Sequence, residues 1–196
     1  MSNTETDKTN KPEMLERIKE RCLDCRGCEL AKTRTNVVFG KGSENAPIMF
    51  VGEAPGEKED LSGEPFVGAA GKLLDKYLEY IGLTLEDVYV ANILKCRPPK
   101  NRDPLPEEED ACMGFLIDQI HTVKPRLLVC LGRISAMRLI SPEFRITKEH
   151  GRWYEFEKIP ITAVYHPAAL LRDPRKKQEM LEDFEMIEAQ LKNLTD

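Results

Sequence analysis

The chain of 196 residues lacks several features that would assign it to a membrane, secreted or repeat class. No apolar run approaches the roughly 20 residues that a membrane-spanning helix needs, so we expect no membrane association. The N-terminal segment has no apolar core, which argues against a secretory signal and favours a cytoplasmic location. Internal repeats and low-complexity segments are also missing. These absences favour one globular domain at residues 12–196, after a polar tail at residues 1–11 that we expect to be disordered.

Positive charge is scarce overall but locally concentrated. The net charge of −5 gives no general support for nucleic-acid binding. Residues 95–102 nevertheless contain four bases and no acid, and residues 172–177 contain four bases and one acid. Each segment alone is compatible with an ordinary solvated surface. If the protein binds nucleic acid, these two segments are where we expect the phosphate contacts.

Four short apolar runs predict buried strands, because each is bounded by residues that favour turns or helix starts. The predicted strands are 48–51, 88–94, 126–131 and 159–165. Segments with helical periodicity alternate with them, and this alternation implies parallel βαβ units. We therefore predict a three-layer α/β/α sandwich around a central, mainly parallel four-stranded sheet.

Apolar residues three and four apart predict the helices that cover this sheet. The predicted helices are 12–22, 70–81, a helix opened by Pro106, 132–140 and 175–194. Two smaller features complete the chain. Residues 34–42 are expected to form a short strand and turn, and residues 146–157 a hairpin around Gly151.

A loop rich in glycine, proline and carboxylates follows the first predicted strand. It lacks the lysine and the Ser or Thr of a P-loop, and it lacks the glycine spacing of a dinucleotide fingerprint. It carries several carboxylates and one aromatic ring, Phe66. Open α/β sheets bind ligands at this end of their strands. The loop therefore suits a polar or cationic reacting centre next to a flat ring.

Polar side chains stand at the ends of three predicted strands: Glu53, Asn92 and His166. The carboxyl ends of parallel strands share one edge of a sheet, so we expect these side chains and Phe66 to meet in one crevice. An asparagine amide can both donate to and accept from a nucleobase edge, and an aromatic ring can stack on the base. Each residue alone also has a plain structural explanation, as a helix-start acid, a turn former, a loop residue or part of the core. Their joint placement favours a base pocket.

The six cysteines of a cytoplasmic protein are expected to be thiols or metal ligands rather than disulfides. Cys25 and Cys28 are separated by two residues, while Cys96 and Cys112 lie much farther apart. Thiolates in such a set bind zinc or a [4Fe–4S] cluster, and the spacing alone leaves both open. Cys22 has the same spacing to Cys25, and Cys130 lies inside a predicted strand as a small buried residue.

Three segments resemble the signature segments of the family-4, iron–sulfur uracil-DNA glycosylases. These segments are VGEAPGEKEDLSGEPFVGAAGKLL, YVANILKCRPP and HPAALLR. The resemblance covers residues from about 22 to 190. It implies the uracil-DNA glycosylase fold and a monofunctional DNA-repair enzyme that flips uracil out of DNA, hydrolyses its N-glycosidic bond and leaves an abasic site. The expected partner is uracil-containing DNA, single- or double-stranded, and the expected state is a monomer.

The resemblance also implies a role for each matching position. Glu53 would orient water and stabilise positive charge on the sugar, and His166 would donate a hydrogen bond to uracil O2. Four other residues would hold the base: Ala54 through its backbone amide, Glu59 by crowding C5 against thymine, Phe66 by stacking, and Asn92 by reading the Watson–Crick edge.

The same comparison implies DNA contacts and a cofactor. Leu170 and Leu171 would enter the duplex to hold the base out, and phosphate contacts would come from three bases: Lys100, Arg102 and Arg172. A [4Fe–4S] cluster would be held by four cysteines: Cys25, Cys28, Cys96 and Cys112. Zinc is the alternative metal. Either would pin the N-terminal segment to the loop after the second strand.

Two other function classes stay open at this point. A related subgroup captures uracil covalently through a histidine in an inserted basic loop, whereas the short loop KCRPPKNRDPLP has no histidine. No lysine is placed as an obvious Schiff-base nucleophile, which argues against lyase chemistry. An electron-transfer or structural iron–sulfur module would leave Asn92, His166 and Phe66 unexplained.

Overall fold

A computed structural model of the chain describes residues 10–194. The expected disordered tail therefore lies outside the described residues, except for its last two positions. Lys11 already belongs to the first helix, α1 (Lys11–Leu23), and the Asn10 side chain accepts a hydrogen bond from the Glu13 backbone N–H at 3.3 Å. The first helix thus begins one residue before the predicted boundary at residue 12.

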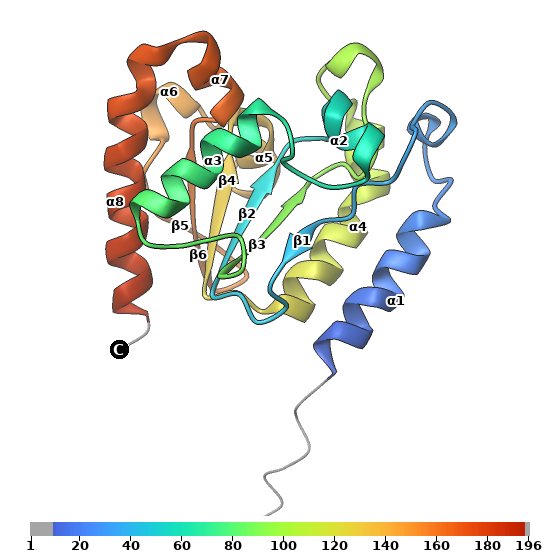
Figure 1. Cartoon of the computed structure of the whole chain (residues 1–196), viewed down its shortest axis with the longest axis horizontal. Coiled ribbons are helices and arrows are strands. Elements are labelled where there is room, and N and C mark those ends of the chain that lie inside the picture. The colour runs from blue at the N-terminus through green and yellow to red at the C-terminus, as the bar shows by residue number, and fades with distance from the viewer. Residues whose placement is uncertain (1–9, 195–196) are drawn as a thin grey trace, which may run out of the picture.

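Four parallel strands form the centre of the sheet (Figure 1). They are β2 (Ile48–Gly52), β3 (Val88–Asn92), β4 (Leu127–Leu131) and β6 (Ile159–Val164), in the spatial order β3-β2-β4-β6. The four predicted strands are confirmed. The sheet has six strands rather than four, because β1 (Lys41–Gly42) and β5 (Tyr154–Phe156) add antiparallel edges. Both are too short and too exposed to give a buried-strand pattern.

Helices cover both faces of the sheet and complete the three predicted layers (Figure 1). One face packs against α1, α4 (Pro106–Val123) and α5 (Arg133–Leu139). The other face packs against α3 (Ala69–Tyr80), α7 (Pro167–Arg172) and α8 (Lys177–Asn193). Short helices α2 (Glu57–Ser62) and α6 (Ile146–Glu149) lie in loops.

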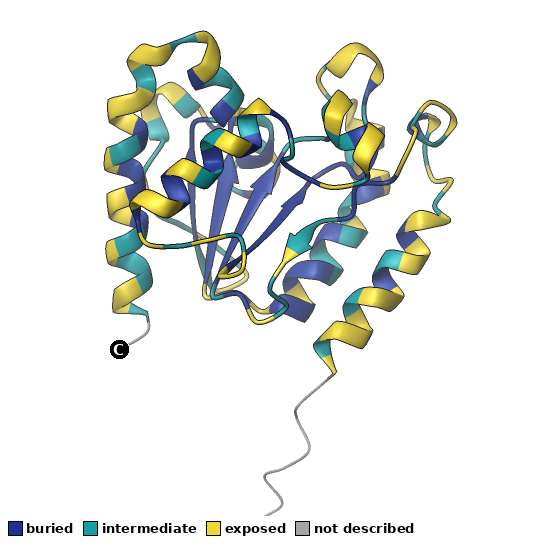
Figure 2. Ribbon diagram, in the orientation of Figure 1, coloured by how far each residue is buried: buried dark blue, intermediate teal, exposed yellow. Residues whose placement is uncertain are grey.

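The inner strands are buried on both faces, which explains their continuous apolar sequences (Figure 2). Successive side chains of β2 point to opposite faces. Met49 and Val51 belong to the core beneath α1 and α4, whereas Ile48 and Phe50 belong to the core beneath α3 and α8. The Phe50 ring stacks on Phe184 of α8 with centroids 6.0 Å apart.

The predicted hairpin around Gly151 is wrong in its position. Residues 146–149 form α6, and the hairpin joins β5 to β6 through Glu157 and Lys158, whose φ angles are 48° and 69°. Such a turn usually carries Asn or Gly, so this pair gave no turn signal. Within residues 10–194, no helix is long and apolar enough to span a membrane.

Candidate active site

A cleft of about 480 Å³ lies at the carboxyl ends of the parallel strands. Eight of the residues predicted from the sequence line it: Glu53, Ala54, Glu59, Phe66, Asn92, Arg102, His166 and Arg172. Asn92 ends β3, and the others come from loops and helices after β2, β3 and β6. The expectation that these strand ends share one crevice is therefore met in the arrangement of the chain.

Asn92 ends β3 directly beside Gly52, its register partner at the end of β2. A Cβ atom at Gly52 would lie 2.3 Å from Asn92 Oδ1 and 2.8 Å from Phe66 Cζ, so only glycine lets both side chains come this close. Asn92 is 3% exposed, and its Oδ1 has no hydrogen-bond partner within the described chain. A buried polar atom without a partner costs about 1–3 kcal/mol, which points to a ligand that supplies the missing donor.

Phe66 provides the flat ring beside this amide. Its backbone has φ of 54°, a conformation that bulky residues rarely adopt. Gly71 of α3 packs against it so closely that a Cβ there would lie 1.7 Å from the Phe66 carbonyl oxygen. The Phe66 ring is 6.2 Å from the His166 ring, with 26° between their planes. The cleft therefore has two nearly parallel rings beside one unpaired amide oxygen.

His166 follows β6 and begins α7. Its Nδ1 accepts a hydrogen bond from the Ala168 backbone N–H at 3.1 Å, so the neutral ring carries its proton on Nε2. The pKa of His166 is lowered to about 4, mainly by burial and also by the positive charge of Arg172, while Glu59 opposes the change. The imidazole is thus neutral at neutral pH and offers one N–H donor.

Two carboxylates line the cleft in different surroundings. Burial raises the pKa of Glu53 to about 7, and Asp103 adds to the rise while Arg133 and Arg172 oppose it. Glu59 on α2 is fixed instead by the Gly68 backbone N–H, which donates to its Oε1 at 2.7 Å. Glu53 therefore gains or loses a proton near neutral pH. The Glu59 side chain is held in one position by its hydrogen bond from Gly68.

The basic rim of the cleft is larger than the sequence predicted. Arg102 donates to both carboxylate oxygens of Glu108, at 2.6 and 2.9 Å, which fixes its position. Arg133 pairs with Asp103 at 2.6 Å, and Lys176 Nζ lies 4.5 Å from the centre of the Tyr165 ring. Sequence reasoning missed Arg133, and it included Lys176 only as one base of the segment 172–177, without a place in the cleft. The reasoning that placed Glu53, Asn92 and His166 at strand ends also applies to Arg133, which lies two residues after the end of β4.

Three predicted DNA contacts lie outside the lining of the cleft. Lys100 is exposed in a 3₁₀ turn, Pro99–Asn101. Leu171 is 50% exposed, but Leu170 is fully buried in the core with α3 and α8. In this structure Leu170 faces the core and Leu171 faces outward from α7, so the insertion of Leu170 into the duplex stays a prediction.

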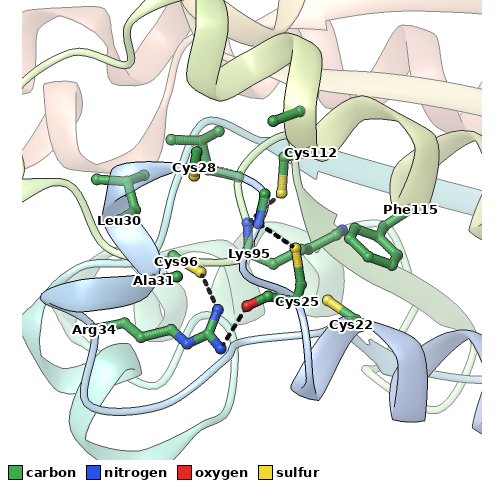
Figure 3. Close-up of a pocket in the computed structure, with 13 residues that line it drawn as sticks. Cys22, Cys25, Cys28, Leu30, Ala31, Arg34, Lys95, Cys96, Cys112 and Phe115 are labelled. Carbon is green, nitrogen blue, oxygen red and sulfur yellow. Dashed lines mark hydrogen bonds between the residues drawn. The ribbon is translucent and has the colours of Figure 1, made fainter.

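Five cysteines line a second, enclosed pocket beside α1 and α4 (Figure 3). Cys25 and Cys28 come from the loop after α1, Cys96 from the loop after β3, and Cys112 from α4. Cys22 of α1 lines the pocket as well and is 1% exposed. The structure thus brings the four predicted ligands together but leaves the choice between Cys22 and its neighbours open.

Backbone and side-chain N–H groups point at several of these sulfur atoms. The Lys95 backbone N–H donates to Cys112 Sγ at 3.2 Å, and Arg34 Nη1 donates to Cys96 Sγ at 3.2 Å (Figure 3). A thiol set with N–H donors to sulfur fits the chemistry of an iron–sulfur cluster or of zinc. Within residues 10–194, no three or more His, Cys, Asp or Glu side chains are arranged to hold a metal ion. The metal therefore stays a prediction.

Comparison with known proteins gives a consistent result. The family model described as "Uracil DNA glycosylase superfamily" matches residues 39–189. A type-4 uracil-DNA glycosylase from Archaeoglobus fulgidus is 50% identical over 89% of this chain and 92% of its own. Similar enzymes from Sulfurisphaera tokodaii and Thermotoga maritima are 46% and 42% identical, over 88% and 92% of this chain and 83% and 96% of their own.

Proposed function

The chain belongs to the uracil DNA glycosylase superfamily, and from this premise we propose that it excises uracil from DNA during repair. It is a monofunctional hydrolase that cleaves the N-glycosidic bond, releases free uracil and leaves an abasic site. The observation that carries the site assignment is the buried, unpartnered Oδ1 of Asn92 beside the Phe66 ring. An extruded pyrimidine would supply the donor that this oxygen lacks and a flat face for the ring.

The base would be recognised by four groups around the floor of the cleft. The Asn92 amide pairs with the N3–H and O4 edge of uracil, and Phe66 stacks on its face. The backbone amide of Ala54 contacts the base from the loop after β2. Glu59, held by Gly68, occupies the space that the C5 methyl group of thymine would need. Steric exclusion by this fixed side chain would give a preference for uracil over thymine.

Bond cleavage would proceed with charge developing at two places. As the bond between C1′ and N1 breaks, positive charge grows on the sugar and negative charge grows on the uracil ring. Ionised Glu53 stabilises the positive charge on the sugar and orients the water whose oxygen adds to C1′. The neutral His166 donates from Nε2 to uracil O2 and stabilises the negative charge on the ring. A preorganised donor of this kind commonly contributes about a hundred- to thousandfold in rate.

DNA would be held along the basic rim of the cleft. Arg102, Arg172 and Lys100 contact phosphates, and the exposed Leu171 enters the gap left by the flipped base. Arg133 and Lys176, which also line the cleft, extend this positive surface. Flipping requires a few kcal/mol of unstacking, which these contacts offset.

A [4Fe–4S] cluster would be held by Cys25, Cys28, Cys96 and Cys112. When bound, it supplies a redox-active, thiolate-ligated centre that ties three segments of the chain together. The family type and the N–H donors to sulfur support this cofactor, and zinc is the alternative. Iron and acid-labile sulfide analysis of anaerobically purified protein, with zinc measured alongside, tests the assignment. Zinc without iron would overturn it.

One assay separates the candidate functions. A labelled oligonucleotide with a single uracil is treated with the enzyme and then with alkali, with a thymine-containing strand as control. Alkali-dependent strand cleavage at uracil with many turnovers per enzyme is the expected result. A stable protein–DNA adduct would indicate covalent trapping instead, and an intact strand would indicate a structural or electron-transfer module. Running the assay on single- and double-stranded DNA gives the strand preference.

A further inference from the structure

Lys95 is buried between the thiol pocket and the uracil cleft. Its exposed fraction is 1%, although it carries an ammonium group. Lys95 Nζ donates to the backbone oxygen of Asn92 at 2.8 Å and to Gln119 Oε1 at 2.6 Å. Its backbone N–H donates to Cys112 Sγ at 3.2 Å, as Figure 3 shows. One residue therefore contacts both the base-reading strand end and a predicted metal ligand.

Burying an ammonium group between neutral acceptors is expensive in free energy. The effective penalty is several kcal/mol per ion, and an apolar side chain of similar volume would avoid it. Its two hydrogen-bond acceptors carry no charge to offset this cost, and the nearby thiols of Cys112 and Cys22 favour the ammonium group. The ammonium group also holds both acceptors in fixed positions.

The hydrogen bond from Lys95 holds the backbone of Asn92 in place. Gln119 is itself anchored, because its Nε2 donates to the Phe39 backbone oxygen at 2.9 Å and to Tyr89 Oη at 3.0 Å. Lys95 thus connects the Asn92 carbonyl to a rigid point on α4. The Asn92 Oδ1 has no partner of its own, so its direction depends on the backbone that carries it.

We propose that Lys95 is a positioning residue that holds the Asn92 amide in its base-reading orientation. This proposal rests on the proposed role of Asn92 in reading uracil. Lys95 does not touch the base and acts only through Asn92.

A double-mutant cycle between Lys95→Met and Asn92→Ala tests this role in the full-length, iron-loaded enzyme. Lys95→Met is expected to lower the single-turnover excision rate by about 10- to 100-fold, the usual effect of losing an outer-shell partner. In the Asn92→Ala background, the same change should lower the rate less than about twofold, because nothing is left to position. Lys192→Met, at the exposed end of α8, controls for the loss of a lysine charge far from the cleft and should leave the rate unchanged.

Two further measurements distinguish positioning from a general structural effect. Inhibition by free uracil should weaken in Lys95→Met, while affinity for DNA with an abasic-site analogue and the iron content should match wild type. If Lys95→Met does not accumulate, Lys95→Gln, whose side chain is one atom shorter, is used in the same cycle. Equal rate losses in both backgrounds, or loss of iron together with activity, would overturn the proposal. If Asn92→Ala excises uracil normally, the proposed function of the cleft fails instead.

Discussion

At the scale of single residues, the two candidate catalytic side chains differ in charge because their surroundings differ. The pKa of Glu53 is raised to about 7, mainly by burial, so the ionised form dominates only above neutral pH. The pKa of His166 is lowered to about 4, so its imidazole is neutral throughout the physiological range. The mechanism needs an ionised Glu53 and a neutral His166. Glu53 therefore controls how the rate varies with pH.

We predict that the single-turnover excision rate rises with pH and levels off, with an apparent pKa near 7. Protonation of Glu53 below this value removes the charge that stabilises the sugar cation, so the rate falls as the pH decreases. Titration of His166 does not change the excision rate between pH 5 and 9, because its imidazole stays neutral there. Rapid-quench assays from pH 5.5 to 8.5 measure the profile, and Glu53→Gln should abolish its rise. A rate that increases towards acid pH would contradict both assignments.

The same carboxylate should destabilise the fold at alkaline pH. Its pKa lies above the ordinary value of 4.5, so the folded state binds more protons between pH 4.5 and 7 and the free energy of unfolding falls as pH rises through this range. Glu53→Gln should therefore raise the free energy of unfolding by about 1–3 kcal/mol at pH 8 and by much less near pH 4.5. Urea unfolding of wild type and Glu53→Gln at both pH values measures this difference in the free energy of unfolding. Equal effects at the two pH values would show that burial does not penalise the charge.

The sequence predicts those residues of the site whose positions depend only on the order of the strands. Glu53, Asn92 and His166 follow strands, and parallel strand ends must share an edge, so their meeting was predictable. Which of two adjacent leucines faces solvent depends on the rotation of α7 about its axis, and this is set by packing against the core. Lys176 is brought to the cleft by the Tyr165 ring, a contact that no local pattern encodes.

At the scale of elements, the first turn of α3 fixes the stacking ring. Gly71→Ala would place a Cβ 1.7 Å from the Phe66 backbone oxygen, and this contact cannot exist without movement of the Phe66 segment. We predict a loss of about 1–3 kcal/mol in the free energy of unfolding, as in other overpacked sites. We also predict weaker inhibition by free uracil, because the ring shifts from its stacking position. Denaturant unfolding and inhibition assays measure the two effects.

Gly114→Ala provides the matched control on α4. A Cβ at this position meets nothing within 4 Å, and the residue lies inside a regular helix. Alanine there should raise the free energy of unfolding by roughly 0.5–1 kcal/mol and leave uracil inhibition unchanged. If both variants lower stability and uracil affinity alike, the close approach at Gly71 is not what holds Phe66.

The elements differ in how well the sequence predicts them, for physical reasons. Strands β2, β3 and β4 are buried on every residue, so their apolar runs are unambiguous. The edge strand β1 has two residues, and its pairing with β3 comes from the sheet and not from its own sequence. Helices α2 and α7 are six residues each, too short to show a helical period, and α7 depends on the His166 cap.

At the scale of the whole molecule, the thiol pocket joins segments that the sheet alone leaves separate. The loop after α1 contacts the remainder of the protein through Arg34, whose Nη2 donates to the backbone oxygens of Leu23 at 3.1 Å and Cys25 at 2.9 Å. The same guanidinium donates to Cys96 Sγ, beyond β3. A metal centre at these thiols would connect three parts of the chain: the N-terminal segment, the loop after β3, and helix α4. Its removal should affect folding more than chemistry.

We predict that Cys28→Ser loses bound iron and lowers the melting temperature, whereas Cys22→Ser retains its iron although its buried hydroxyl also lowers stability. Cys28 is half-buried in the loop at the pocket, while Cys22 packs within the core as part of α1. A structural metal contributes its binding free energy to folding, so its loss lowers stability directly. Iron analysis, calorimetry and excision of uracil measured below the melting temperature separate stability from catalysis. Cys130→Ala, in the centre of β4, controls for the loss of a buried thiol and should keep its iron. Iron loss in Cys22→Ser with retention in Cys28→Ser would reassign the fourth ligand to α1, and the pocket would then anchor the first helix directly.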